Sequence, residues 1–355
     1  MVRLVSSRLP RIGCSFMHLR FAFVVLIASA QPFLLAAAHA QPKVGLTELH
    51  VPDPTRPLLG LLWYPTRGGG TPGLVGDTRL FVGNAAIQGA PLSDGLHPLV
   101  VLSHGWGGNA LNQGWLAAGL AARGIVVAAI NHPGSTTGDI DPKAAVAIWN
   151  RTDDVSRTLA FLLTDPEFAR HIDPRRIAVI GHSLGGSTAL AMAGVRVSRD
   201  RLIAWCADHD DEGCPDLRRA GLASLDRDRF DGSHRDGRAA AVVAIAPGFT
   251  PAITGEGWAD VHVPVLVIGG GLDRNIPPEH LRAMAAAMSP TARYLNIPAA
   301  SHFDFLPVCK PDGAQLLQAD GDDPICNSGA DRARLHTQVA EVIAQFLSHT
   351  AGWGG

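Results

Sequence analysis

A serine between two glycines directly follows a short apolar run in this chain. Residues 181–185 read Gly-His-Ser-Leu-Gly, the spacing G-x-S-x-G, and the apolar run covers residues 177–180. This spacing is typical of a nucleophile elbow, a sharp turn between a strand and a helix that exposes the serine hydroxyl. Glycines are required there because larger side chains would collide with the strand or the helix. The motif therefore predicts that Ser183 is a nucleophile.

A serine hydroxyl is a poor nucleophile unless a base accepts its proton and a carboxylate orients that base. In the fold that carries this motif, the order along the chain is serine, acid, histidine. Of the seven histidines after Ser183, only His302 lies just past an expected last strand, in a loop of small residues. Asp273 follows the expected strand 265–268 through a glycine-rich turn. We expect a triad of these three residues; the alternative role for Asp273 is a cap for the helix that begins near Pro278.

The negatively charged oxygen that forms when a serine attacks a carbonyl requires two main-chain N–H donors. We expect one from Leu184, which follows the nucleophile. The second is expected from Trp106, in the glycine-rich loop 104–108 that follows the apolar run 100–103. His104 precedes the nucleophile in the chain, so we expect it to hold this loop by a hydrogen bond and not to react.

The segments that must position these residues alternate between two patterns. Continuous apolar runs indicate strands buried on both faces of a parallel sheet, and they cover residues 98–102, 125–130, 177–180, 240–245, 265–268 and 294–297. Helical spacing covers residues 112–122, 142–163, 184–195, 278–288 and 332–348. Residues 45–51 and 58–64 alternate in polarity and predict an antiparallel start. The expected fold is α/β, a mostly parallel central sheet with helices on both faces, in one catalytic domain over residues 41–355.

Two polar segments, 198–238 and 307–331, interrupt this alternation. Loops this long are uncommon without a role, so we expect them to cross the carboxyl edge of the sheet. They act there either as lids over the site or as decoration with no part in substrate binding.

Each of these two segments carries a pair of cysteines. Cys206, Cys214, Cys309 and Cys326 allow three disulfide pairings. The two local pairings, within each segment, would each stabilise the fold by about 2 to 3 kcal/mol; the alternative is four unpaired thiols. No C-x-x-C spacing occurs, so no metal site is expected.

Residues 1–40 have the layout of a secretory signal peptide. Four arginines and no acidic residue precede an uncharged stretch over residues 21–38. Ala38 and Ala40 supply the small residues at positions −3 and −1 of a cleavage site. We expect cleavage after Ala40 and a secreted or periplasmic protein with no stable membrane insertion. The alternative is an uncleaved membrane anchor.

The composition narrows the class of protein further. Of the 355 residues, 46% are hydrophobic and 17% are charged, which excludes a disordered or collagen-like chain. The 30 basic and 32 acidic residues leave no positive surplus, so no nucleic-acid partner is expected. No phosphate-binding glycine motif follows the first expected strand, so we expect no nucleotide cofactor.

Several short motifs together carry a resemblance to a known family. They are Trp63-Tyr64-Pro65, Ser103-His104-Gly105-Trp106-Gly107-Gly108, His132-Pro133-Gly134, Asp153-Asp154-Val155, Gly181-His182-Ser183-Leu184-Gly185-Gly186 and Ser301-His302-Phe303. Outside the two polar segments, residues 45–348 resemble the exported bacterial relatives of platelet-activating-factor acetylhydrolase, often called dienelactone-hydrolase-like, in the α/β-hydrolase superfamily. Dienelactone hydrolases have a cysteine nucleophile and this chain has Ser183, so the lactone substrate is not carried over.

The resemblance implies a serine hydrolase that cleaves carboxylic esters of small molecules through an acyl-enzyme on Ser183. Asp273 and His302 would complete the triad, with Trp106 and Leu184 as oxyanion donors. The same triad could instead cleave amides, peptides or polyesters, because it fixes the mechanism and not the leaving group. A non-catalytic binding protein on a hydrolase scaffold is the alternative from a different class.

Overall fold

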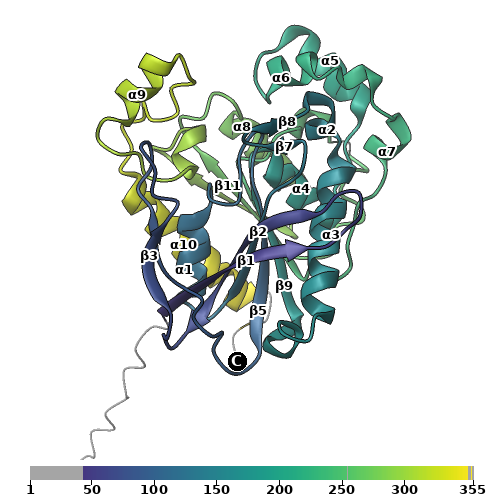
Figure 1. Ribbon diagram of the computed structural model, residues 1–355. Coiled ribbons are helices and arrows are strands. Elements are labelled where there is room, and N and C mark those ends of the chain that lie inside the picture. The colour runs from purple at the N-terminus through teal and green to yellow at the C-terminus, as the bar shows by residue number, and fades with distance from the viewer. Residues whose placement is uncertain (1–42, 254, 351–352, 354–355) are drawn as a thin grey trace, which may run out of the picture. The chain divides into compact units, whose positions relative to one another are not determined.

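The computed structural model describes residues 43–253, 255–350 and 353 (Figure 1). The expected signal peptide over residues 1–40, with its cleavage site, lies outside the described residues. Within the described ranges, no helix combines the length and the apolar character that a membrane crossing requires.

A ten-stranded sheet organises the described chain, in the order β12-β11-β10-β9-β5-β6-β2-β1-β4-β3. Its strands are β1 (Lys43–Val51), β2 (Leu58–Thr66), β3 (Thr71–Val75), β4 (Asn84–Gln88), β5 (His97–Ser103), β6 (Val126–Ile130), β9 (Ile172–His182), β10 (Ala241–Ile245), β11 (Val265–Gly270) and β12 (Ala292–Ile297). From β6 to β12 every neighbouring pair is parallel, whereas β2 is antiparallel to both β1 and β6. The expected fold class and its antiparallel start are confirmed.

The helices cover both faces of this sheet. They are α1 (Gly114–Ala121), α2 (Pro142–Val146), α3 (Ile148–Thr164), α4 (Leu184–Ala193), α5 (Arg199–Asp208), α6 (Cys214–Arg219), α7 (Arg227–Asp231), α8 (Pro278–Ala287), α9 (Gly313–Asp320) and α10 (Arg332–Thr350). Short pieces complete the chain: η1 (Ala169–His171), η2 (Leu222–Ser224), η3 (Thr250–Ala252), η4 (His302–Phe305) and the pair β7 (Ser135–Thr136) and β8 (Asp139–Ile140).

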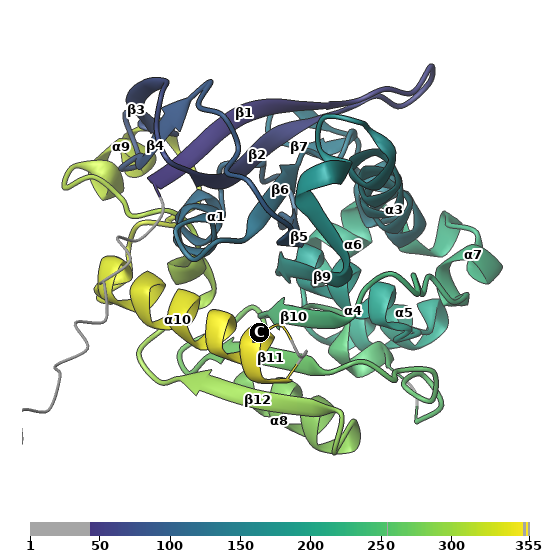
Figure 2. The ribbon, with the colours of Figure 1, turned by 90° about the horizontal axis from the view of Figure 1, so that it is seen from below.

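Alternate residues of each central strand enter opposite halves of the core. On β5, Val100 and Leu102 pack with α1 and α10, while Leu99 and Val101 pack with α3, α4 and α8. Figure 2 shows α1 and α10 on one side of the sheet and α3 and α4 on the other. Because both faces are covered, these strands are apolar throughout, which explains the continuous runs in the sequence.

Two local differences from the sequence-based expectation have physical reasons. The single helix expected over residues 142–163 is broken at Ala147 into α2 and α3, because the consecutive side chains of residues 146–149 are all buried, which one straight helix with a single inward face could not achieve. Strands β3 and β4 were not expected; β3 is exposed at four of its five residues and so shows no apolar run.

The two polar segments, expected to be irregular, contain short helices. Segment 198–238 holds α5, α6 and α7, and segment 307–331 holds α9. The side chains of Ser198 and Asp226 cap α5 and α7, and Leu202 and Phe230 are buried beneath them. The structure joins Cys206 to Cys214 and Cys309 to Cys326, the two local pairings. In Figure 1, α5 and α6 stand above one end of the sheet and α9 stands above the same end on the other side.

Candidate active site

Ser183 lies at the sharp turn between β9 and α4. Its backbone has φ 56° and ψ −123°, a conformation that costs a residue with a side chain about 1 to 3 kcal/mol. The turn is held by a 2.8 Å hydrogen bond from the Ser183 N–H to the carbonyl of Ile245 on β10. A Cβ on Gly181 would collide with the carbonyl of Gly185, and a Cβ on Gly185 would collide with the carbonyl of Ser103. The glycines are therefore required by backbone contacts on both sides of the serine.

The structure brings Ser183, His302 and Asp273 together from three separate strand ends. Nε2 of His302 lies 3.0 Å from the Ser183 hydroxyl oxygen, and Nδ1 of His302 lies 2.8 Å from an oxygen of Asp273. His302 and Asp273 are only 6% and 4% exposed, so the contacts between them are shielded from water. In this geometry Nδ1 can donate to the carboxylate while Nε2 accepts the hydroxyl proton.

Hydrogen bonds to the other carboxylate oxygen of Asp273 fix the direction of the carboxylate. Its Oδ1 accepts hydrogen bonds from the main-chain N–H groups of Asn275 and Ile276, at 2.9 and 2.8 Å. Helix α8 begins at Pro278 without any side-chain cap, so the alternative role of Asp273 as its cap is wrong. The carboxylate binds its own loop with one oxygen and His302 with the other.

A second histidine, His182, contacts the main chain of His302. The side chain of His182 is buried, and its Nε2 lies 3.1 Å from the main-chain carbonyl of His302. Burial and the neighbouring His302 ring lower the pKa of His182 well below its usual range, so this ring is neutral. His182 therefore fixes the main chain that carries His302.

The two residues expected to supply oxyanion donors lie beside Ser183. Trp106 and Leu184 border the same cavity as Ser183 and His302. Within the described residues, neither main-chain N–H donates a hydrogen bond to another protein group. A Cβ on Gly105 would lie 3.2 Å from the Ser183 Cβ, so the loop that carries Trp106 lies directly against the serine. Both N–H groups can therefore serve a ligand oxygen.

A cavity of about 500 Å³ opens onto Ser183. Segment 198–238 contributes Glu212 and Leu217 to its wall, and segment 307–331 contributes Leu317 and Ile325. Both polar segments therefore border the site, while the choice between lids and decoration with no part in substrate binding stays a prediction. Among the described residues that line the cavity there is no lysine or arginine.

No arrangement for a metal is found in the part of the chain that the structure describes: no three His, Cys, Asp or Glu side chains gather there as a ligand set.

A model of the alpha/beta hydrolase family matches residues 100–311, a range that begins in β5 and includes Ser183, Asp273 and His302. The chain belongs to the alpha/beta hydrolase family. The superfamily expected from the sequence motifs is thereby confirmed, while the narrower resemblance to relatives of platelet-activating-factor acetylhydrolase stays a prediction.

Curated relatives of this alpha/beta hydrolase include two cutinases. Cutinase est2 of Thermobifida alba is 27% identical over 218 residues, which are 60% of this chain and 55% of that protein. Cutinase 2 of Thermobifida cellulosilytica is also 27% identical over 218 residues, 60% of this chain and 63% of that protein. The match thus spans somewhat more than half the length of these relatives.

A solved structure shows the same fold along most of the hydrolase. The ferulic acid esterase from Streptomyces cinnamoneus has a TM-score of 0.59 and 23% sequence identity, and the comparison covers 89% of this chain and 92% of that chain. At this identity the likeness establishes the fold alone.

Sequence reasoning missed a buried cation behind the loop 104–108 of this hydrolase. Arg151 on α3 is 1% exposed and donates hydrogen bonds to the carbonyl of His104 and to the hydroxyls of Ser103, Ser135 and Thr188. Burial lowers the pKa of Arg151 to about 9, so it still carries its charge at neutral pH. The helical spacing of α3 predicts which positions face inward. It does not predict that the arginine at position 151 is buried.

A second serine–histidine–aspartate row lies beside Arg151, closed off from solvent. Ser103 Oγ lies 2.9 Å from Nε2 of His132, and Nδ1 of His132 lies 3.0 Å from Asp154. Burial and the charge of Arg151 lower the pKa of His132 to about 4. Burial acts to raise the pKa of Asp154, but hydrogen bonds from His132 and Arg56 outweigh it and hold that pKa at about 2. All three side chains of the row are buried, so they support the loop and cannot meet a substrate.

The expectation that His104 holds the loop agrees with its contacts. The side chain is 1% exposed, its Nδ1 lies 2.7 Å from the carbonyl of Gly105, and its Nε2 accepts a hydrogen bond from the main chain of His132 at 3.2 Å. The loop carrying Trp106 is therefore fixed from inside by His104, Arg151 and the buried row.

Proposed function

We propose that this protein is a serine hydrolase that cleaves carboxylic esters of small molecules through an acyl-enzyme on Ser183. The observation that carries the proposal is the unbroken contact from Ser183 through His302 to Asp273, at 3.0 and 2.8 Å. His302 accepts the Ser183 proton as Oγ attacks the ester carbonyl carbon, and Asp273 balances the charge of the imidazolium.

The N–H groups of Trp106 and Leu184 bind the negatively charged oxygen of the tetrahedral intermediate. When that intermediate collapses, the bond to the alcohol breaks and His302 returns the proton to the leaving oxygen. A water molecule then attacks the acyl-enzyme, with His302 again accepting a proton, and releases the carboxylic acid and free Ser183.

The choice of ester over other acyl groups is supported by the similar proteins, whose names describe cutinases and a ferulic acid esterase. The same relay would cleave amides, peptides or polyesters, so the leaving group is decided by assay and not by the triad. A binding protein without turnover remains the contrasting outcome of the test below.

We infer that residues 41–355 form one catalytic domain, exported after cleavage of the signal peptide at Ala40. The two disulfides support export because such bonds persist in oxidising compartments. The cavity wall contains carboxylates and, among the described residues, no lysine or arginine, which favours uncharged substrates over anionic ones.

Hydrolysis of p-nitrophenyl butanoate by the wild type and by Ser183→Ala tests the proposal. Loss of the nucleophile should lower kcat by about 10⁴-fold or more, with an unchanged circular dichroism spectrum. Ser348→Ala on α10, outside the residues that line the cavity, is the matched control and should retain full activity. Equal turnover by Ser183→Ala and the wild type would refute the nucleophile, and no turnover by either would support a binding protein.

A further inference from the structure

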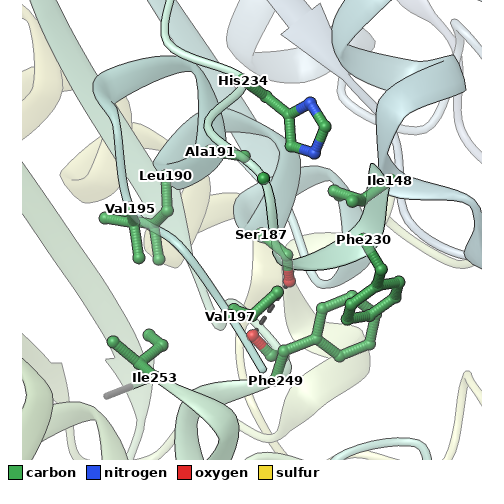
Figure 3. A pocket seen from close by; sticks show the side chains of 12 residues that line it. Ile148, Ser187, Leu190, Ala191, Val195, Val197, Phe230, His234, Phe249 and Ile253 are labelled. Atoms are coloured by element: carbon green, nitrogen blue, oxygen red, sulfur yellow. Dashed lines mark hydrogen bonds between the residues drawn. The ribbon is translucent and has the colours of Figure 1, made fainter. Parts of the chain in front are cut away.

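A small apolar cavity lies behind the active-site cavity, under segment 198–238 (Figure 3). Its free space is about 10 Å³, scarcely room for one water molecule. Most of its wall is hydrocarbon, contributed by Ile148, Leu190, Val195, Val197, Phe230 and Ile253. In its present form this cavity is too small to admit any part of a substrate.

Only Gly248 and Phe249 border both this cavity and the active-site cavity, among the residues that the structure describes. Because Gly248 has no side chain, the ring of Phe249 forms the partition. Figure 3 shows that ring beside Phe230, and the two ring centroids are 6.0 Å apart. Removal of the Phe249 ring would therefore join the two spaces.

The few polar groups of the small cavity are compatible with a hydrocarbon ligand. The Ser187 hydroxyl donates a 2.9 Å hydrogen bond to the carbonyl of Gly248, drawn as a dashed line in Figure 3. Burial lowers the pKa of His234, so its ring is uncharged at neutral pH. No charged group of the described residues lines the cavity.

The backbone of Phe249 has a conformation that a residue with a side chain rarely adopts, and contacts of its neighbour hold it there. Its φ is 67°, in the left-handed region. The next residue, Thr250, donates hydrogen bonds from its N–H and its hydroxyl to the carboxylate of Glu212, which is 2% exposed. Glu212 is held in turn by His280, whose Nδ1 lies 2.9 Å from the carboxylate. Segment 198–238 thus fixes the partition through Glu212.

The loop that carries the Phe249 ring is also linked to Ser183 by contacts between neighbouring residues. Ser183 donates its N–H to Ile245, and a Cβ on Gly186 would lie 3.0 Å from Pro247. The loop 246–250 therefore packs on the first turn of α4, so an acyl group on Ser183 that extends to this side of the cavity meets the Phe249 ring.

We propose that Phe249 sets the length of the acyl chain that the site accepts, by closing the small apolar cavity to substrate. The proposal rests on the ester hydrolase function proposed above. Aliphatic acyl chains end at the ring in the wild type, and the hydrocarbon cavity behind it receives the chain once the ring is shortened. Engineered apolar cavities of about 150 Å³ bind small apolar ligands, so the enlarged space behind the shortened side chain suits the end of an aliphatic chain.

The test compares kcat/KM for p-nitrophenyl esters from acetate to octanoate in the wild type and Phe249→Ala. Each methylene that enters the opened cavity should raise kcat/KM by about fourfold. The ratio of octanoate to butanoate should therefore rise by about tenfold or more in the variant. Phe161→Ala on α3 is the matched control, because Phe161 borders neither cavity, and its ratio should equal that of the wild type.

Labelling of Ser183 by a fluorophosphonate, measured on the same preparations, separates the two proposals. A ratio within about twofold of the wild type in a Phe249→Ala protein that still labels overturns the role of Phe249 and leaves the hydrolase function intact. A wild type that neither labels nor hydrolyses any ester overturns both. If Phe249→Ala does not fold, Phe249→Leu provides the measurement, with an expected rise of about threefold and an unchanged ratio again contradicting the proposal.

Discussion

Arg151 donates a hydrogen bond from its buried guanidinium to the main-chain carbonyl of His104, the residue that begins the loop carrying Trp106. The same guanidinium binds Thr188 on α4, the helix that starts beside Ser183. One cation therefore connects the loop 104–108 to α4, and the two sides of the candidate site are positioned relative to each other by α3.

Replacement of Arg151 by methionine should disturb the oxyanion loop without touching substrate. We expect kcat for p-nitrophenyl butanoate to fall by about 10- to 100-fold with little change in KM, because one oxyanion donor is displaced. Loss of the buried hydrogen bonds should also lower the free energy of unfolding by about 3 kcal/mol. Arg175→Met, at a side chain 86% exposed, should change neither quantity. A stability loss with unchanged kcat would show that Arg151 does not position the loop.

Glycine at position 185 should be irreplaceable on the proposed turn. A Cβ there meets the carbonyls of Ser103 and His104, whose positions Arg151 and the buried row fix. We expect Gly185→Ala to lower the free energy of unfolding by about 3 kcal/mol or more in urea titrations. Gly237→Ala is the control, since a Cβ there meets nothing within 4 Å and should be tolerated. Equal stability of the two variants would contradict the contact.

Buried neutral histidines should make the protein sensitive to acid. Burial lowers the pKa of His336, stacked on Trp115, to about 4, compared with 6.5 for an exposed histidine. Between these values the unfolded chain binds a proton that the native state does not, so stability falls as the pH falls from 6.5 to 4. We expect His336→Gln to show a shallower decline of the free energy of unfolding over this range. Parallel declines in the two proteins would contradict a neutral His336.

The disulfide between Cys206 and Cys214 should stabilise segment 198–238 and, through Glu212, the active-site wall. Replacement of both cysteines by serine should lower the free energy of unfolding by about 2 to 3 kcal/mol. We also expect a lower kcat/KM, because Glu212 lies inside the loop that the disulfide closes. Replacement of Cys309 and Cys326 is the comparison for stability, because the loop that this disulfide closes does not contain Glu212. Four free thiols in the folded, unreduced protein would rule out both disulfides.

The strands and the turn around Ser183 were accessible to sequence reasoning because their signals are local. A strand buried on both faces requires a continuous apolar run, and the turn around Ser183 requires glycines at fixed spacing. The proximity of Asp273 and His302 to Ser183 was expected from the order of the predicted triad along the chain and from the position of each residue after a strand. The antiparallel start was visible because residues 45–51 and 58–64 alternate in polarity.

The features that could not be predicted depend on contacts between distant parts of the chain. Strand β3 is almost entirely exposed, so it carries no apolar pattern. The helices of the two polar segments are short and are held by caps and by contacts with the rest of the protein. Arg151 resembles any surface arginine in a sequence, and only the fold places four acceptors around it. The left-handed backbone conformation of Phe249 could not be predicted either, because nothing nearby in the sequence requires it.

The proposed relay is tested most directly by the mass of the intact native protein after reaction with a fluorophosphonate, followed by peptide mapping of the adduct. We predict one adduct, on Ser183, and a labelling rate at least about 100-fold slower in His302→Ala, because the hydroxyl then lacks its base. An adduct on a different residue, or a folded protein that stays unlabelled, would contradict the central claim that His302 activates Ser183.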